Sequence, residues 1–147
     1  MTVATELYAN TPPVAVRKTV TFTGAADLGA QGAVPLFTIT GSVVIEKIVG
    51  NCTADLVSAG GGSLALGVTG ATTLFIGATT ATAIDVGEIW ASTTPTAGGI
   101  ALPAALKDIA INADIIGTVA TGDITAGAID ILVVYRQLSS DGALVAA

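Results

Sequence analysis

The residues that could carry out catalysis are few in this chain of 147 residues. There is no histidine, so the commonest general base and metal ligand is missing. The single cysteine, Cys52, has no histidine to activate it, and we interpret it as a small buried strand residue. One cysteine cannot form an internal disulfide, and zinc sites built from cysteine and histidine are excluded. We therefore expect no catalytic residues, no metal site and no cofactor.

The acidic residues offer the remaining route to chemistry. Asp85 and Glu88 lie three residues apart, and Asp123 and Asp130 lie on either side of a glycine turn. A calcium loop needs several closely spaced oxygen ligands, as in D-x-D-x-D-G, and the sequence has no such run. A hydrolase using a pair such as Asp85 and Glu88 is the competing hypothesis, but six aromatic residues are few for a sugar-binding cleft. We interpret these acids as turn residues and expect a protein that is not an enzyme.

Composition excludes two further classes of partner. Hydrophobic residues make up 52% of the chain and the mean hydropathy is +0.80, yet no apolar run approaches the roughly 18 residues of a spanning helix. The N-terminus also lacks the basic and apolar regions of a secretory signal. The net charge is −6, and of the five basic residues only Arg17 and Lys18 are adjacent. We expect neither membrane insertion nor nucleic-acid binding, which depends on clustered basic residues.

Alternation of apolar and polar residues dominates the chain and indicates half-buried β-strands. Glycine-rich turns separate these runs at spacings of roughly ten residues, as in antiparallel sandwiches. Only residues 103–107 could form a helical turn, because Pro103 is tolerated at a first helical position. The sequence predicts an all-β protein, an antiparallel β-sandwich or jelly roll of about eight strands, at residues 19–23, 34–40, 42–50, 63–69, 72–77, 86–91, 109–115 and 129–136.

The predicted organisation has three parts. An extended N-terminal arm covers residues 1–16, the sandwich covers 17–142, and a short apolar tail covers 143–147. The two adjacent prolines of the arm prevent it from joining a central strand. We predict that arm and tail lie against neighbouring subunits; the alternative is that the tail folds back onto its own sheet. Trp90 has two interpretations, core packing or an interface anchor. The predicted contact residues are Leu7, Tyr8, Pro12, Pro13, Trp90, Leu144 and Val145.

The expected outer faces of the strands carry Thr, Ser, Ala and Gly in place of charged residues. Threonine fills strand positions well, so propensity alone explains part of this composition. Charges on exposed strands, however, also protect sheets against unwanted pairing. A chain that largely omits them is expected to bury its faces and edges in an assembly. We predict self-association, as a homotrimer.

The sequence resembles the small head proteins of tailed bacteriophages, the decoration or cement class. The resemblance rests on PLFTITGSVVIEKIVGN, on GGGSLALGVTGATTLFIGATTATAIDVGEIW, and on the ending ILVVYRQLSSDGALVAA. These are patterns of composition and not a catalytic fingerprint, so no functional residue can be transferred by position.

The resemblance implies a β-sandwich, often trimeric, that sits on the outside of the capsid and clamps neighbouring subunits of the major capsid protein. It would need no cofactor, would be made in the host cytoplasm and would be located on the capsid surface of the virion. Another virion component is the alternative, either a tail or baseplate module or a β-domain that binds carbohydrate or a receptor.

Overall fold

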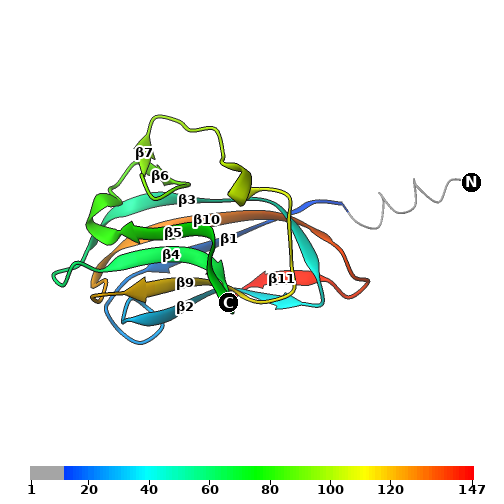
Figure 1. Ribbon diagram of the computed structural model, residues 1–147, viewed down its shortest axis with the longest axis horizontal. Coiled ribbons are helices and arrows are strands. Elements are labelled where there is room, and N and C mark those ends of the chain that lie inside the picture. The colour runs from blue at the N-terminus through cyan, green and yellow to red at the C-terminus, as the bar shows by residue number, and fades with distance from the viewer. Residues whose placement is uncertain (1–11) are drawn as a thin grey trace, which may run out of the picture.

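The alternating strands pair into two antiparallel sheets that face each other across one apolar core (Figure 1). The structure is a computed structural model that describes residues 12–147. Most of the predicted arm, including Leu7 and Tyr8, lies outside the described residues. The fold confirms the predicted all-β class and the two-layered sandwich.

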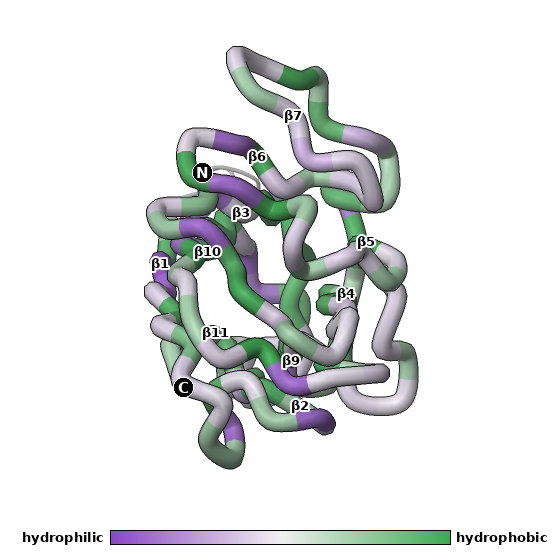
Figure 2. Tube along the Cα trace, turned by 90° about the vertical axis from the view of Figure 1, so that its left-hand side faces the viewer, coloured by the Kyte–Doolittle hydropathy of each residue, from purple (hydrophilic) through white to green (hydrophobic). Residues whose placement is uncertain are grey.

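One layer is a six-stranded sheet with the order β1-β10-β3-β6-β7, in which β8 also pairs with β3. The bounds of its strands are β1 Val14–Thr21, β3 Val43–Val57, β6 Glu88–Trp90, β7 Thr96–Ala97, β8 Ile109–Ile111 and β10 Ala126–Gln137. The other layer is a five-stranded sheet with the order β11-β2-β9-β4-β5. Its strands are β2 Gly32–Thr40, β4 Ser63–Val68, β5 Ala71–Thr80, β9 Ile115–Ala120 and β11 Ala143–Ala146. Figure 2 shows the two layers along the strands.

Two short 3-10 turns lie in the connections between strands; the first joins the five-stranded sheet to the six-stranded sheet, and the second contacts β3 and β5. They are η1, Ala81–Ala83, after β5, and η2, Ala104–Leu106, before β8. The second lies within the segment for which a helical turn was predicted, and Pro103 stands immediately before it. The segment containing β6 and β7 protrudes from the sandwich (Figures 1 and 2).

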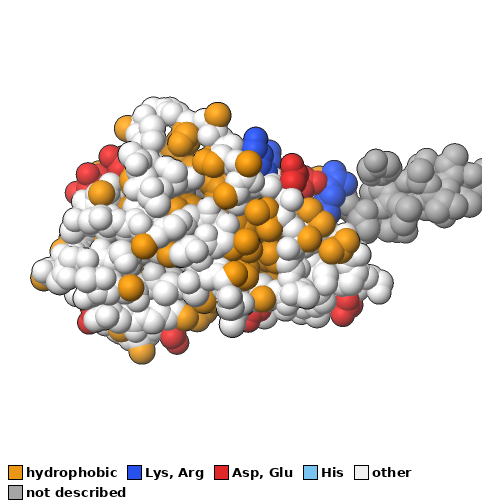
Figure 3. All heavy atoms as spheres, in the orientation of Figure 1, with side chains coloured by type: hydrophobic (Ala, Val, Ile, Leu, Met, Phe, Trp, Pro, Cys, Tyr) orange, Lys and Arg blue, Asp and Glu red, His pale blue; other side chains and the backbone are white. Residues whose placement is uncertain are grey.

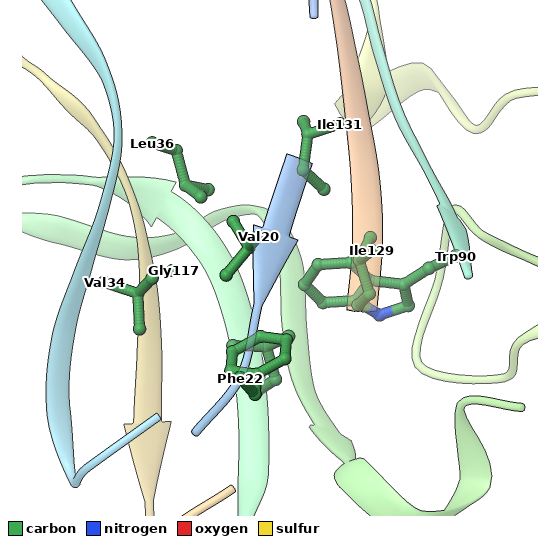
Figure 4. A pocket seen from close by; sticks show the side chains of 9 residues that line it. Val20, Phe22, Val34, Leu36, Trp90, Gly117, Ile129 and Ile131 are labelled. Carbon is green, nitrogen blue, oxygen red and sulfur yellow. The ribbon is translucent and has the colours of Figure 1, made fainter. Parts of the chain in front are cut away.

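The core consists of the inward side chains of both sheets. In β10 the predicted alternation holds, because Ile129, Ile131, Val133 and Tyr135 are buried while the residues between them are partly exposed. A void of about 10 Å³ remains between the sheets, lined by apolar side chains and one glycine (Figure 4). A cavity of this size is at the lower limit for one water molecule and offers it no polar partner. The core is therefore closely packed and holds no ligand site.

Trp90 is the largest side chain in this core and connects the two sheets. It is only 1% exposed, and its ring packs over Gly50, its partner across the β3–β6 pair. Its indole N–H donates to Oγ1 of buried Thr79, 3.0 Å away in the five-stranded sheet. The Thr79 hydroxyl in turn donates to the carbonyl oxygen of Gly77. The polar atom of a large core residue is thus satisfied, as burial requires.

A β-bulge in β3 explains why the alternation of that strand changes phase. Val134 pairs with Lys47 and Tyr135 with Ile45, so Glu46 is the extra residue. The Glu46 carbonyl accepts a hydrogen bond from the amide of Asp108, and its carboxylate pairs with Arg136 of β10. The bulge thereby keeps Ile45 and Ile48 both directed into the core.

The described residues contain eleven strands, where about eight were expected. The run 109–115 is two strands, because the chain leaves β8 and enters β9 of the other sheet. Strand β7 is too short to show alternation. The predicted arm is also shorter than expected, since Val14–Val16 already pair with β10.

The prediction that residues 143–147 form a tail outside the core is wrong. Residues Ala143–Ala146 form β11, the outer strand of the five-stranded sheet, paired with Phe37–Thr40 of β2. Leu144 is 2% exposed and belongs to the core, whereas Val145 is 57% exposed on the opposite face. Alternation in so short a strand buries one side chain and leaves the next in solvent.

Candidate interaction surfaces

The two acids considered for catalysis hold a turn together. Asp85 and Glu88 lie in the connection between η1 and β6, where the Glu88 amide donates to the Asp85 carbonyl oxygen. The Glu88 carboxylate accepts a hydrogen bond from the Asp85 amide, 3.4 Å away. Asp85 is exposed and Glu88 is partly exposed. Neither lines the void between the sheets or either of the two surface grooves described below. The arrangement matches the interpretation as turn residues.

The other acids considered also bind neighbouring groups of the chain. Asp123 accepts a hydrogen bond from the amide of Gln31, and Asp130 accepts one from the hydroxyl of Thr19. Among residues 12–147 there is no group of three or more Cys, Asp or Glu side chains placed to hold a metal ion.

Cys52 is buried in β3, as expected from the sequence. Its thiol donates to the carbonyl oxygen of Ala54 at 3.1 Å. Burial raises the pKa of this thiol, the hydrogen bond to Ala54 lowers it, and the nearby carboxylates of Asp55, Asp85 and Glu88 raise it further. A thiol that is both buried and kept protonated is a poor nucleophile.

The predicted contact residues fall into different environments. Trp90 and Leu144 are core residues, so the structure corrects their assignment as interface residues. Pro12, Pro13 and Val145 are exposed and can contact a partner.

All five aromatic side chains of the described chain are buried: Phe22, Phe37, Phe75, Trp90 and Tyr135. The described part of the chain therefore presents no aromatic platform to a sugar.

The two sheets differ in charge. The described strands of the five-stranded sheet contain no Asp, Glu, Lys or Arg. The six-stranded sheet carries Arg17, Lys18, Glu46, Lys47, Asp55, Glu88, Asp130 and Arg136. Figure 3 shows charged side chains only at the margin of the view, while the surface over β4, β5 and β9 is uncharged.

The outer face of the five-stranded sheet, here called the uncharged face, is built from small and apolar residues. Across β2, β9 and β4, Ala33 pairs with Thr118 and Thr118 with Ala65. Ala33 is exposed, Thr118 is partly exposed and Ala65 is only 5% exposed, so the face is most open over β2. The next row contains Pro35 and Ile116. The Thr118 hydroxyl oxygen is buried without a hydrogen-bond partner. Natural sheets that stay in water usually carry charges on such a face, so this face suits contact with another protein.

A groove of about 190 Å³, here called the edge groove, lies where the margins of the two sheets meet. Strand β11 covers only the second half of β2, and the amide of Ala147 makes the last hydrogen bond, to the Leu36 carbonyl oxygen. Residues 32–35 of β2 therefore pair with β9 on one side and with no described strand on the other. The groove is lined by Lys18, Thr19, Val20, Asp27, Leu28, Val34, Pro35 and Ala147.

A second groove of about 160 Å³ lies near β8, lined by Ser42, Ala110, Ile111, Asn112 and Leu138. It contains no charged side chain and no paired acids, so it offers neither a catalytic group nor a metal site.

No helix in residues 12–147 has the length and apolar character needed to cross a membrane. No protein-family model, curated protein or solved structure matches the chain. The choice among functions therefore depends on the residues and the geometry described above.

Proposed function

We propose that the chain is a structural, non-enzymatic virion protein that binds the outside of a phage capsid and stabilises it by bridging neighbouring subunits. It acts as a homotrimer whose partner is the major capsid protein. The observation that carries the proposal is the uncharged face. A sheet face without charges is a liability for a protein free in water and an advantage for one that is permanently covered.

The rest of the described chain supports a structural role. Glu88, Asp123 and Asp130 bind backbone amides and a hydroxyl, the cysteine is buried, and the void between the sheets is too small for a ligand. A role in carbohydrate binding has no support, because the aromatic residues of the described chain are buried. A tail or baseplate component would use the same kind of surface and is separated from a capsid protein by its location on the particle.

The test places positive charges on the uncharged face. Thr38→Lys and Ala33→Lys alter exposed residues of β2 and leave the core intact. Thr53→Lys is the matched control, because it alters an exposed threonine of β3 in the six-stranded sheet. Each variant is added to capsids depleted of the protein, and occupancy and heat resistance are measured. The β2 variants should bind at least tenfold more weakly than the control.

Two outcomes contradict the proposal. Equal occupancy of the β2 variants, the control and the unaltered chain would exclude the uncharged face as the attachment surface. Equal heat resistance of capsids with and without the protein would exclude the stabilising role.

A further inference from the structure

We propose that residues 2–8 of one copy add a strand to the edge groove of a second copy. The proposal deepens the self-association part of the proposed function and needs no capsid. It identifies the acceptor on this chain, its ligand, and the residues by which the two recognise each other.

The edge groove offers backbone groups to an added strand. Strand β1 pairs with β10 on one side and with no described strand on the other. The first half of β2 is likewise open beyond Leu36, where β11 ends. An exposed strand edge presents unpaired N–H and C=O groups, and an extended peptide can satisfy them by β-augmentation. The groove is thus an acceptor with a free edge on each margin.

The lining of the groove selects an apolar strand with one acid. Val20 and Val34, which are core residues, form its floor, and Leu28 is 42% exposed on its wall. Leu28 is one of the few large apolar side chains that the described surface exposes. Among the side chains that line the groove, Lys18 is the one cation and Asp27 the one acid.

Residues 2–8, TVATELY, have the matching pattern. In an extended segment Val3, Thr5 and Leu7 share one face and Ala4 and Glu6 share the other. We expect Val3 and Leu7 to turn toward the groove and Glu6 to lie at its rim, where the partly exposed Lys18 can meet it. The single acid of the segment, Glu6, has a partner of opposite sign in Lys18.

Asp27 limits how the segment can lie. It repels Glu6, so we expect the segment to place Glu6 on the Lys18 side and an apolar residue beside Leu28. Lys18 already donates to the carbonyl oxygen of Ala147, and an ammonium group has three donors, so it can bind a carboxylate as well.

The prolines favour a second copy as the donor. Pro12 and Pro13 are exposed and immediately precede β1, whose start is several residues away from the groove at Lys18–Val20. Consecutive prolines keep their own segment extended and disfavour a tight reversal at that point, so we expect the donor segment to reach a second copy more readily than the edge of its own β1. A donor segment and an acceptor groove on each copy form a head-to-tail contact, which closes into a ring when the rotation permits.

Cysteine cross-linking tests the contact directly. A chain with Leu7→Cys is mixed with a chain with Leu28→Cys and oxidised; native Cys52 is buried and does not take part. Non-reducing electrophoresis should give a disulfide-linked dimer, and the double variant should give trimers. The matched control replaces Leu28→Cys by Val86→Cys, which is 59% exposed on the far side of β3 and should give little dimer. A double variant that closes only within one chain, or equal yields with the control, would overturn the proposal.

A second measurement does not depend on added cysteines. Deleting residues 1–11, or changing Leu28→Asp, should lower the mass in sedimentation threefold, to that of the 14.3 kDa chain or slightly less, while the melting temperature stays within a few degrees. Val86→Asp should leave the oligomer intact. An intact chain that is monomeric at micromolar concentration, or an oligomer that survives both changes, refutes the exchange. An arm-dependent oligomer that fails to bind capsids would instead refute only the capsid role.

Discussion

The two sheets have the same kind of inner face and very different outer faces. Both contribute Ile, Val, Leu and Phe to one core, and both are antiparallel. Outside, the six-stranded sheet carries charges of both signs, and the described strands of the five-stranded sheet carry none. Folding requires only the inner faces, so the difference outside reflects what each sheet meets after folding. We infer that one face meets water and the other meets protein.

The margins of the sheets do not repeat this difference. Strand β1, the outer strand of the six-stranded sheet, pairs with β10 on one side and with no described strand on the other. Strand β2 is covered by β11 for only half of its length. The edge groove therefore lies between one open margin from each sheet.

The largest expected effect on the free energy of unfolding comes from removing Trp90, the core side chain that contacts both sheets. Trp90→Ala removes the largest core side chain and its hydrogen bond to Thr79, so we expect a loss of about 3–5 kcal/mol in the free energy of unfolding. Urea unfolding followed by circular dichroism measures it, since the chain has no other tryptophan. Trp90→Phe should cost less, because it retains an aromatic ring. A loss below 1 kcal/mol for Trp90→Ala would mean that the sheets do not depend on this residue.

The next effect concerns the outer strand of the five-stranded sheet. Leu144→Ala should lower the free energy of unfolding by about 2–5 kcal/mol, because Leu144 is buried in the core. Val145→Ala is the matched control and should change it by less than about 0.5 kcal/mol, since this neighbour is exposed. Equal losses would show that β11 contributes only its backbone pairing. The same unfolding measurement serves both variants.

The sequence predicted the long, regular strands best. In β10 alternation continues over enough residues to identify its buried face. The alternation in residues 109–115 did not reveal that β8 and β9 are separate strands, because Asp114 fits the pattern as one more outward strand residue. In the structure the Asp114 side chain accepts a hydrogen bond from the Ile39 amide, and its carbonyl oxygen accepts one from Thr69, which fixes a turn between sheets.

The candidate surfaces were less accessible to sequence reasoning. The scarcity of charges on strands was visible, but which strands share a sheet was not, so the uncharged face appeared only with the topology. Apolar Leu144 suggested an external contact, although its pairing with Ile39 buries it in the same chain. The edge groove exists because β11 ends opposite Phe37, and no local pattern encodes where a distant strand stops.

We expect Cys52 to make the free energy of unfolding of the chain depend on pH in the alkaline range. Burial raises the pKa of its thiol above the ordinary value of 9.0. The folded state then disfavours the thiolate, so stability is complete below the ordinary pKa and declines as the pH rises through the folded value. Unfolding at pH 7 and pH 10 should show a larger loss for the native chain than for Cys52→Ala. The same pH dependence in both chains would assign it to other groups.

The smallest expected effect concerns the charges of the six-stranded sheet. Glu46 and Arg136 form a partly exposed pair at the β3 bulge, and pairs near the surface contribute about 0–1 kcal/mol. Glu46→Gln should therefore lower the free energy of unfolding by less than about 1 kcal/mol, and high salt should reduce the difference. Urea titrations at low and high salt measure it. A small loss would fit charges that only keep the six-stranded sheet in contact with water. A loss of several kcal/mol would show that the pair stabilises the fold itself, so that the charge difference between the sheets would no longer point to their surroundings.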